Sequence, residues 1–322
     1  MQKRLKILVV RFSSIGDIIL TTPVIRCLKS QLNVDLDFLT KRKYKDVLKK
    51  NSNIRDVLTL SDSKEDLLSC LRSNNYDYII DLQNNFRSLR ICLALRVKTY
   101  RYEKNIFKRY LLIYFGINLL NNHVVDRYFN TVNSLNIVND HKGLDYFVEK
   151  PDNLDFNVNQ EYLTWSIGGT HEPKRLSVEQ ISSVLLKLDF PVLLLGSKKE
   201  KYISKQIINN THNRNIYDFC GKTSISESAF LIQNSKGLLT NDTGMMHIAS
   251  AFLIPIISFW GCTKPSLGFS PYMPHAKSEQ IISSFSKNPC SKHGRYCKFK
   301  RKGCVKAISS ETIYNAVIRL LK

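Results

Sequence analysis

The chain contains no long apolar run, although 43% of its 322 residues are hydrophobic. The first apolar run, residues 7–10, ends at Arg11 and is too short to be the core of a signal peptide. No other run approaches the roughly 20 residues that a membrane-spanning helix needs. These absences predict a cytoplasmic protein.

Acidic residues are scarce. There are 27 Asp and Glu against 48 Lys and Arg, which gives a net charge of +21. Such an excess favours anionic partners: nucleotides, phosphorylated glycans, acidic membrane surfaces or nucleic acid. Lys, Asn and Ile are abundant throughout, so part of the charge can be background composition. Charge alone therefore does not choose among these partners.

The turn after the first apolar run has no G-x-G-x-x-G, so the dinucleotide fingerprint is absent. Low-complexity tracts and short repeats are absent too. Instead, the chain has two series of short apolar segments that alternate with helix-like segments, a pattern typical of α/β proteins with parallel sheets. The polar, aperiodic stretch 151–160 separates the two series and predicts domains at 1–155 and 156–322.

The expected elements follow from the apolar periodicity. In the first series we expect strands at residues 6–11, 34–39, 57–60 and 76–82, and helices from residue 18, at 64–72 and at 123–135. In the second we expect strands at 162–167, 191–195, 216–219, 238–240 and 256–259, and helices at 178–188, 201–208, 225–234, 245–252 and 311–322. The last helix could return to the first domain. Two α/β domains facing a central cleft are the predicted architecture.

The turn at residues 241–244 links an apolar strand to a short helix. A helix start offers unpaired N–H groups and partial positive charge, which suit a phosphate. Gly244 lets an anion approach the backbone, and His247 could reach the same space. An equally good local explanation is that Asp242 or Thr243 only caps a core helix.

Two further loops carry candidate residues. Asp17 stands at the entrance of the first helix, where its simpler role is to complement the helix dipole. Arg87 and Arg90 follow the strand at 76–82 and are candidates for binding an anionic acceptor, or are solvated helix charges. The segment 104–120 is basic, aromatic and aliphatic and could lie on an anionic membrane surface. Its apolar residues exceed one narrow face, which favours a helix packed on its own domain.

Four potential soft ligands lie close together near the end of the chain, in the spacing C-x2-H-x3-C-x6-C: Cys290, His293, Cys297 and Cys304. They could hold structural zinc, although the spacing is not a common finger pattern. Reduced cysteines in a basic loop and a disulfide are the alternatives. The other cysteines are scattered, as expected for small buried apolar residues: Cys27, Cys70, Cys92, Cys220 and Cys262.

Four segments together resemble glycosyltransferase family 9, the ADP-heptose:lipopolysaccharide heptosyltransferases: ILVVRFSSIGDIILTTPVIRCLK, GGTHEPKRL, LLLGSKKE and LLTNDTGMMHIASAFLIPIISFWGCTKP. The Asp-Thr-Gly-x-x-His segment and the N-terminal Ser-x-Gly-Asp segment are the specific parts. The resemblance implies a GT-B fold, in which the second domain binds the nucleotide-sugar donor, ADP-heptose, and the first binds an anionic glycolipid acceptor. It also implies a cytoplasmic enzyme with peripheral contact to the inner membrane surface.

The resemblance assigns roles by position. Asp17 matches the catalytic base, and Glu200 matches the acid that binds the nucleotide ribose. The remaining matches are donor-binding residues: Ser14, Gly16, Thr170, Lys174, Asp242, Thr243, Gly244 and His247. Two departures, Gly169 before Thr170 and Leu176-Ser177 in place of Trp-Pro, bear on the base, sugar and acceptor more than on the reaction class.

Inverting glycosyl transfer needs a base for the acceptor hydroxyl and positive groups for the departing diphosphate. Asp17 suits the first task, and Lys174 with the amides at residues 243–244 suits the second. No Asp-x-Asp metal pair occurs in a candidate donor loop, which fits departure without a metal cofactor. Two other functions compete: a nucleic-acid-binding protein with a Cys/His zinc site, and a GT-B-like sugar-nucleotide epimerase. Acids at the loop mouths argue against nucleic acid as a partner.

Overall fold

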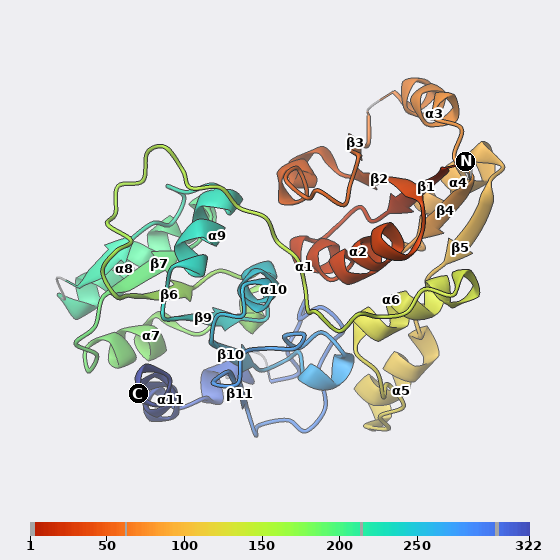
Figure 1. The fold of residues 1–322 in the computed structure, drawn as a ribbon. Coiled ribbons are helices and arrows are strands. Elements are labelled where there is room, and N and C mark those ends of the chain that lie inside the picture. Colours follow the sequence, from red (N-terminus) through yellow and green to blue (C-terminus); the bar gives the residue numbers. More distant parts are fainter. Residues whose placement is uncertain (1–3, 62, 213–214, 300–302) are drawn as a thin grey trace. The chain divides into compact units, whose positions relative to one another are not determined.

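The computed structural model describes residues 4–61, 63–212, 215–299 and 303–322 (Figure 1). The chain packs into two compact units. The first unit comprises residues 1–105 and 122–147, and the second comprises residues 106–121 and 148–322. The predicted single boundary, between residues 155 and 156, differs from this division, because residues 106–121 pack with the second unit.

The first unit contains a five-stranded sheet in the order β3-β2-β1-β4-β5, and every pairing in it is parallel. Its strands are β1 (Leu5–Val10), β2 (Val34–Thr40), β3 (Asp56–Thr59), β4 (Tyr78–Asp81) and β5 (Lys98–Arg101). Its α-helices are α1 (Ile15–Ile19), α2 (Thr22–Gln31), α3 (Lys64–Ser73), α4 (Phe86–Leu95) and α6 (Val124–Val132). Strand β5 was not predicted, because its half-exposed sequence KTYR has no apolar run.

The second unit contains a six-stranded parallel sheet in the order β11-β10-β9-β6-β7-β8. Its strands are β6 (Leu163–Ser166), β7 (Val192–Leu195), β8 (Ile216–Asp218), β9 (Gly237–Asn241), β10 (Ile256–Trp260) and β11 (Glu279–Ile282). Its α-helices are α5 (Ile106–Phe115), α7 (Val178–Leu185), α8 (Lys201–Thr211), α9 (Ile225–Gln233), α10 (Gly244–Ala251) and α11 (Ser310–Leu321). The α/β class with two parallel sheets, predicted from the alternating segments, is confirmed.

Short 3-10 turns lie between these elements. In the first unit they are η1 (Arg42–Val47) and η2 (Asn133–Leu135), and in the second they are η3 (Glu172–Lys174), η4 (Lys198–Glu200), η5 (Pro265–Leu267) and η7 (Val305–Ala307). The second strand not predicted, β11, is an edge strand whose residues alternate between half-buried and exposed.

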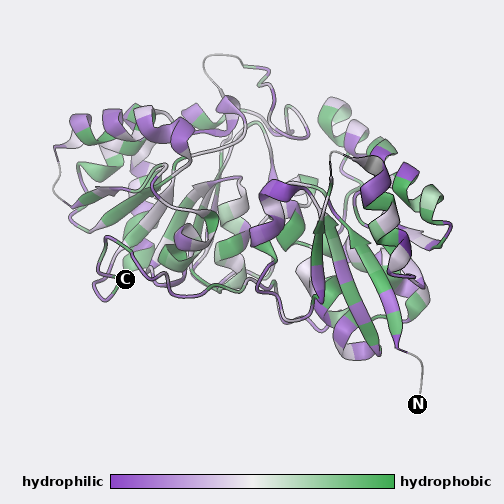
Figure 2. Ribbon diagram, turned by 90° about the horizontal axis from the view of Figure 1, so that it is seen from above, coloured by the Kyte–Doolittle hydropathy of each residue, from purple (hydrophilic) through white to green (hydrophobic). Residues whose placement is uncertain are grey.

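The four central strands of the second sheet, β6, β7, β9 and β10, are buried at every residue, so this part of the sheet is covered on both faces. Along β7, Val192 and Leu194 join one hydrophobic cluster, while Leu193 and Leu195 join another, as the period of two in a strand requires. The first cluster includes residues of α7, α8 and α11, and the second includes residues of α9 and α10. In Figure 2 the strands are largely green, the colour of hydrophobic residues, whereas the helices are banded in green and purple.

The final helix packs within the second unit. Ile313, Ala316, Val317 and Leu320 on one side of α11 join the cluster that also contains residues of α7. Gly237 at the start of β9 makes room for this helix, because a Cβ there would lie 2.8 Å from the Leu320 side chain. The expectation that this helix returns to the first domain is therefore wrong, because its apolar stripe is already buried in the second unit.

Both strand orders reverse direction at one point. In the first sheet the chain moves outward from β1 to β2 and β3, and then returns to place β4 on the other side of β1. In the second sheet it moves from β6 to β7 and β8, and then returns to place β9 beside β6. Doubly wound sheets bind ligands beyond the carboxyl ends of the two strands at such a switch point. No helix among the described residues has the length and apolar character needed to cross a membrane.

Candidate active site

In the first unit, Asp17 lies at the switch point, in the short helix that follows β1. Its Oδ2 accepts hydrogen bonds of 2.9 Å from both the backbone N–H and the hydroxyl of Ser14. Its Oδ1 lies 2.6 Å from a guanidinium nitrogen of Arg11, and 22% of its side chain is exposed. This pairing favours the ionised carboxylate. Gly16, one residue before, is buried, whereas Ser14 is exposed.

Arg11 supports this carboxylate, and no sequence motif identified it as a site residue. It is buried, and its guanidinium also donates to the carbonyl oxygens of Ser13 at 3.1 Å and Leu82 at 2.6 Å. Burial lowers the pKa of Arg11, but Asp17 and other neighbouring groups more than offset this and raise it. Arg11 is therefore a fixed cation that orients Asp17.

The loop after β4 lies at the same edge and is built on Asp81. This fully buried carboxylate accepts hydrogen bonds from the N–H groups of Gln83 and Asn84 and from the hydroxyl of Ser88. The side chain of Gln83 accepts in turn from the N–H of Phe12, at 2.9 Å, which ties this loop to the one after β1. The first turn of α4 therefore starts beside the Asp17 loop.

Arg87 and Arg90 lie on this first turn of α4, and both are exposed. The guanidinium of Arg90 lies over the ring of Phe86, 5.7 Å from its centroid. Exposed cations at the carboxyl edge of the sheet can bind an anionic ligand. The same exposure suits solvated helix charges, so acceptor binding by these two residues stays a prediction.

In the second unit, the loops after β6 and β9 meet at the switch point. Lys174, in η3, pairs with Asp242, with 2.6 Å between Nζ and Oδ2. The side-chain amide of Asn241 donates to the carbonyl of Gly168 at 2.9 Å, which fixes one loop to the other. Thr170 is exposed beside this junction. These two loops thus bring together three of the predicted donor-binding residues.

Helix α10 starts at this junction, with Thr243 as its N-cap residue. The Thr243 hydroxyl lies 3.0 Å from that of Thr240, and the Thr243 side chain makes no capping hydrogen bond. His247 is buried within the unit, only 4% exposed. Donor binding by His247 therefore stays a prediction.

Glu200 follows β7 and is held at the same edge. Its Oε2 accepts from the N–H of Ser197 at 2.9 Å and from the hydroxyl at 2.6 Å. Its Oε1 lies 3.3 Å from Arg175, which also donates to the carbonyl of Gly169. Arg175 was not predicted as a site residue. It stands in the quoted segment GGTHEPKRL, and its position next to Lys174 was the available signal.

The field around these loops is positive. His171 lies between Thr170 and Lys174, and burial lowers its pKa, with a further lowering by Lys174, Arg295 and Arg175. Lys174, Arg175 and Arg295 thus lie near His171, and two of these cations are paired with carboxylates. Together with the N-terminus of α10, the arrangement can bind a diphosphate and stabilise charge that develops on it.

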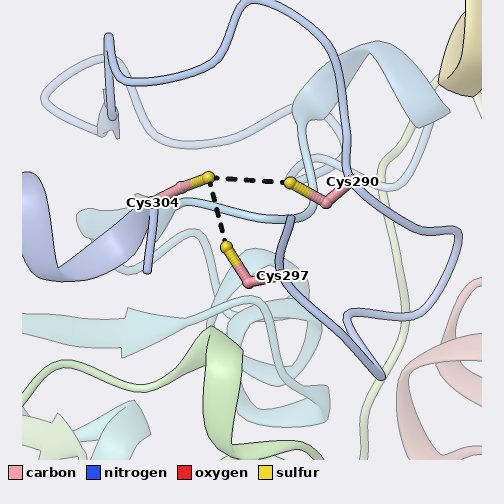
Figure 3. Close-up of side chains that lie close together, drawn as sticks. All are labelled: Cys290, Cys297 and Cys304. Atoms are coloured by element: carbon pink, nitrogen blue, oxygen red, sulfur yellow. Dashed lines mark hydrogen bonds between the residues drawn. The ribbon is translucent and has the colours of Figure 1, made fainter. Parts of the chain in front are cut away.

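The cysteines of the tail form a cluster in the same unit. The sulfur of Cys304 lies 3.7 Å from that of Cys290 and 3.6 Å from that of Cys297 (Figure 3). All three are buried, and Cys262, which follows β10, packs with them. His293 is exposed and lies outside the group of potential ligands found among the described residues. Packing therefore puts Cys262, and not His293, beside the three predicted cysteines, although the Cys262 sulfur also lies outside the group of three potential ligands found among the described residues.

Two doubly wound parallel sheets, each with polar and charged groups at its switch point, define an α/β protein of the GT-B class. Residues 66–302 match the model of glycosyltransferase family 9 (heptosyltransferase). The chain belongs to this family, as the sequence motifs predicted.

Individual relatives agree at low identity. Lipopolysaccharide heptosyltransferase 1 of Campylobacter coli is 24% identical over 349 aligned positions, covering 98% of this chain and 99% of that enzyme. The match to lipooligosaccharide heptosyltransferase 2 of Haemophilus ducreyi, at 29% identity, spans only 32% of this chain and 30% of that enzyme. Among solved structures, E. coli ADP-heptose lps heptosyltransferase II superposes with a TM-score of 0.75 at 19% identity, covering 98% of each chain. The iron-containing glycosyltransferase TibC of enterotoxigenic E. coli gives 0.60 at 14% identity, covering 100% of this chain and 77% of that one.

Proposed function

We propose that this protein is an inverting glycosyltransferase that moves heptose from ADP-heptose to a lipopolysaccharide core or a related cell-envelope glycan. The observation that carries the proposal is the Lys174–Asp242 pair at the β6–β9 switch point, next to the N-terminus of α10. A cation and a helix start at one place suit a nucleoside diphosphate. Family membership and the names of the relatives support the choice of sugar and acceptor.

The second unit binds the donor. Lys174, Thr170 and the amides at Thr243 and Gly244 hold the diphosphate, and Lys174 exchanges part of its contact with Asp242 for phosphate oxygens. Glu200 accepts a hydrogen bond from the ribose, because Ser197 already fixes the orientation of its carboxylate. His247, one turn into α10, is a further donor-binding residue of this unit. The first unit contributes Ser14 and Gly16 to the donor.

The first unit provides the base. The acceptor hydroxyl oxygen forms a bond to the anomeric carbon while the bond from that carbon to the diphosphate oxygen breaks. The proton passes to the carboxylate of Asp17, and the electron pair leaves with ADP, so the anomeric configuration inverts. Arg87 and Arg90 bind anionic groups of the acceptor.

The departing diphosphate is stabilised by Lys174 and the start of α10, so we assign no metal cofactor to the transfer step. For the cysteine cluster we propose a structural role. Three buried sulfur atoms within 4.8 Å of one another are a suitable ligand set for a thiophilic ion such as zinc.

Peripheral contact with the inner face of the cytoplasmic membrane is also part of the proposal. Helix α5 and the residues after it expose several large apolar side chains: Ile106, Phe107, Tyr110, Tyr114, Phe115, Ile117 and Leu119. Lys108 on the same helix and Lys298 beside Tyr114 add positive charge. An apolar face with adjacent lysines suits an anionic lipid surface, where the glycolipid acceptor is anchored.

The proposed function is tested by mass spectrometry of products from ADP-heptose, with and without a heptose-free lipid A–core acceptor. We expect acceptor mass to increase by one heptose, with equimolar ADP, only when both substrates are present. A nucleotide sugar altered without any acceptor would indicate an epimerase. Absence of both products while the protein binds nucleic acid would contradict the proposal.

A further inference from the structure

The cysteine cluster lies next to Lys174, the lysine assigned to the donor diphosphate. Cys290 and Cys297 bound a short loop of the tail, and Gly294 stands within that loop. A Cβ at Gly294 would lie 2.4 Å from Cγ of Lys174 and 2.5 Å from its Cδ. Gly294 also has a φ of +72°, which favours glycine. The stem of Lys174 therefore packs on the backbone of the loop that two of the cysteines hold.

The three sulfur atoms have the spacing of a metal site. Four sulfurs at about 2.3 Å from a tetrahedral zinc ion are about 3.8 Å apart, whereas a disulfide joins its sulfurs at about 2.05 Å. The observed separations of 3.7 Å and 3.6 Å at Cys304 match the first arrangement. All three sulfurs belong to one buried cluster, so an ion there would be shielded from water.

Cys262 is the side chain best placed to complete this set. Its carbonyl accepts a 2.8 Å hydrogen bond from the N–H of Cys290. Next to it, Gly261 lets Val305 approach so closely that a Cβ would lie 2.4 Å from the Val305 nitrogen. The backbone at Cys262 is thus fixed to Cys290 by a hydrogen bond, and it packs beside Val305, the residue after Cys304. Its sulfur now points to the carbonyl of Pro173, at 3.3 Å.

A buried cation gives a second indication. Lys264 is only 3% exposed, and its ammonium donates to the carbonyl of Ser283 at 2.6 Å. Burial of a lysine charge is costly unless an anion compensates for it. Lys264 follows Cys262 by two residues, and a divalent ion with four thiolates carries a net charge of −2. A metal–thiolate centre would therefore supply the compensating negative charge.

We propose that Cys262, Cys290, Cys297 and Cys304 bind one transition-metal ion, zinc or iron, and that this ion holds Lys174 in its donor-binding position. The Cys262 side chain turns from Pro173 toward the other three sulfurs when the ion binds. The ion then fixes the loop at residues 290–297 on which Lys174 rests, and it releases the carbonyl next to Lys174. The link to donor binding rests on the proposed function, whereas the metal site does not.

The first experiment measures zinc and iron by mass spectrometry in the full chain purified without a polyhistidine tag. We expect about one equivalent of metal in the wild type, in Cys70→Ser and in His293→Ala. Cys70 is an exposed cysteine of the first unit and serves as the matched control. We expect less than half an equivalent in Cys262→Ser and Cys304→Ser. Less than half an equivalent in the wild type, or full occupancy in Cys262→Ser, would overturn the proposed ligand set.

The second experiment measures ADP binding by calorimetry before and after removal of the metal with a chelator. We expect affinity to fall about tenfold, which corresponds to about 1.4 kcal/mol, and to return when the ion is restored. Gly294→Ala should keep the metal, because all four cysteine ligands are intact. It should still weaken ADP binding, because the added Cβ displaces the side chain of Lys174. Equal affinity with and without metal would overturn the coupling. A metal-loaded wild type that binds no ADP would refute the proposed function and leave the metal count standing.

Discussion

At the scale of single residues, Asp17 has two tasks that use different parts of its carboxylate. It closes the start of α1 through Ser14, and it forms an ion pair with the buried Arg11. The local explanation and the catalytic one are therefore compatible. The sequence could identify Asp17 through its motif, but it could not identify Arg11. Only the fold buries Arg11 and brings it both to Asp17 and to the carbonyl of Leu82, 71 residues away.

The Asp17→Asn variant separates these tasks, because the amide still accepts a hydrogen bond from Ser14 but cannot take up the proton. We expect turnover to fall by about 10²- to 10⁴-fold, while ADP affinity stays within about twofold. The measurement is single-turnover product formation, with ADP affinity determined by calorimetry. Asp35→Asn is the control, because Asp35 pairs with Arg4 in the same unit, near the start of β2. Undiminished turnover in Asp17→Asn would remove the assigned base.

Glu200 tests the ribose assignment independently. Its carboxylate is held by Ser197 and Arg175, so Glu200→Gln changes the charge while keeping the shape. We expect ADP to bind about tenfold more weakly and ribose-free pyrophosphate to bind as before. Competition binding measures both. A parallel loss of pyrophosphate affinity would mean that Glu200 acts on the phosphate loops.

At the scale of elements, the sequence predicted the strands that contain apolar residues, including the edge strands β3 and β8, and missed the edge strands β5 and β11. Strands β1, β7 and β10 are largely apolar, and a capping residue such as Ser177 marks a helix start. The missed strands, β5 and β11, are short edge strands with polar residues, so local pattern carries little signal for them. Cys262 was likewise assigned to the scattered cysteines, because only the fold brings the end of β10 to the tail.

Helix α2 is joined to the segment after α6 by one ion-pair network. Arg26 donates two hydrogen bonds of 2.8 Å to Asp140, one to each oxygen, and it also pairs with Asp145. The hydrogen bond from Arg26 lowers the pKa of Asp140 from 3.8 to about 2. A carboxyl whose pKa is lower in the folded chain contributes stability above its unfolded pKa, and this contribution disappears as pH falls through the folded pKa.

We therefore expect the free energy of unfolding of the wild type to decrease more steeply between about pH 4 and pH 2 than that of Asp140→Asn. Denaturant unfolding at a series of pH values measures the difference. Parallel pH profiles for the two proteins would show that the Arg26–Asp140 contact does not form in solution.

At the scale of the whole molecule, the two units have the same organisation, and each sheet has its candidate residues at its own switch point. The strand order explains why residues as distant as Lys174 and Asp242 meet. Motifs alone could indicate that they act together, but only the fold explains their contact. The exposed apolar side chains of α5 also concern the whole molecule, because we propose that they contact a membrane surface.

Replacement of Phe107 and Phe115 by Ser tests the membrane contact. Both side chains are largely exposed, so the change should leave folding intact while reducing binding to vesicles with anionic lipid by about tenfold or more. Cosedimentation with vesicles at low and high salt is the measurement. Leu186→Ser, an exposed apolar residue after α7, is the control. Unchanged vesicle binding in the double variant would exclude α5 as the contact.

The central claim is that the switch point of the second unit binds the donor diphosphate, and ADP binding by calorimetry tests it most directly. Lys174→Ala should bind ADP about 10- to 100-fold more weakly than the wild type, because a charge-assisted contact is lost. Lys236→Ala should bind ADP normally. Lys236 is exposed and pairs with Glu161, and it precedes β9, at the amino ends of the strands, whereas the proposed donor site lies at their carboxyl ends. Equal ADP affinity in the wild type and Lys174→Ala would contradict the account.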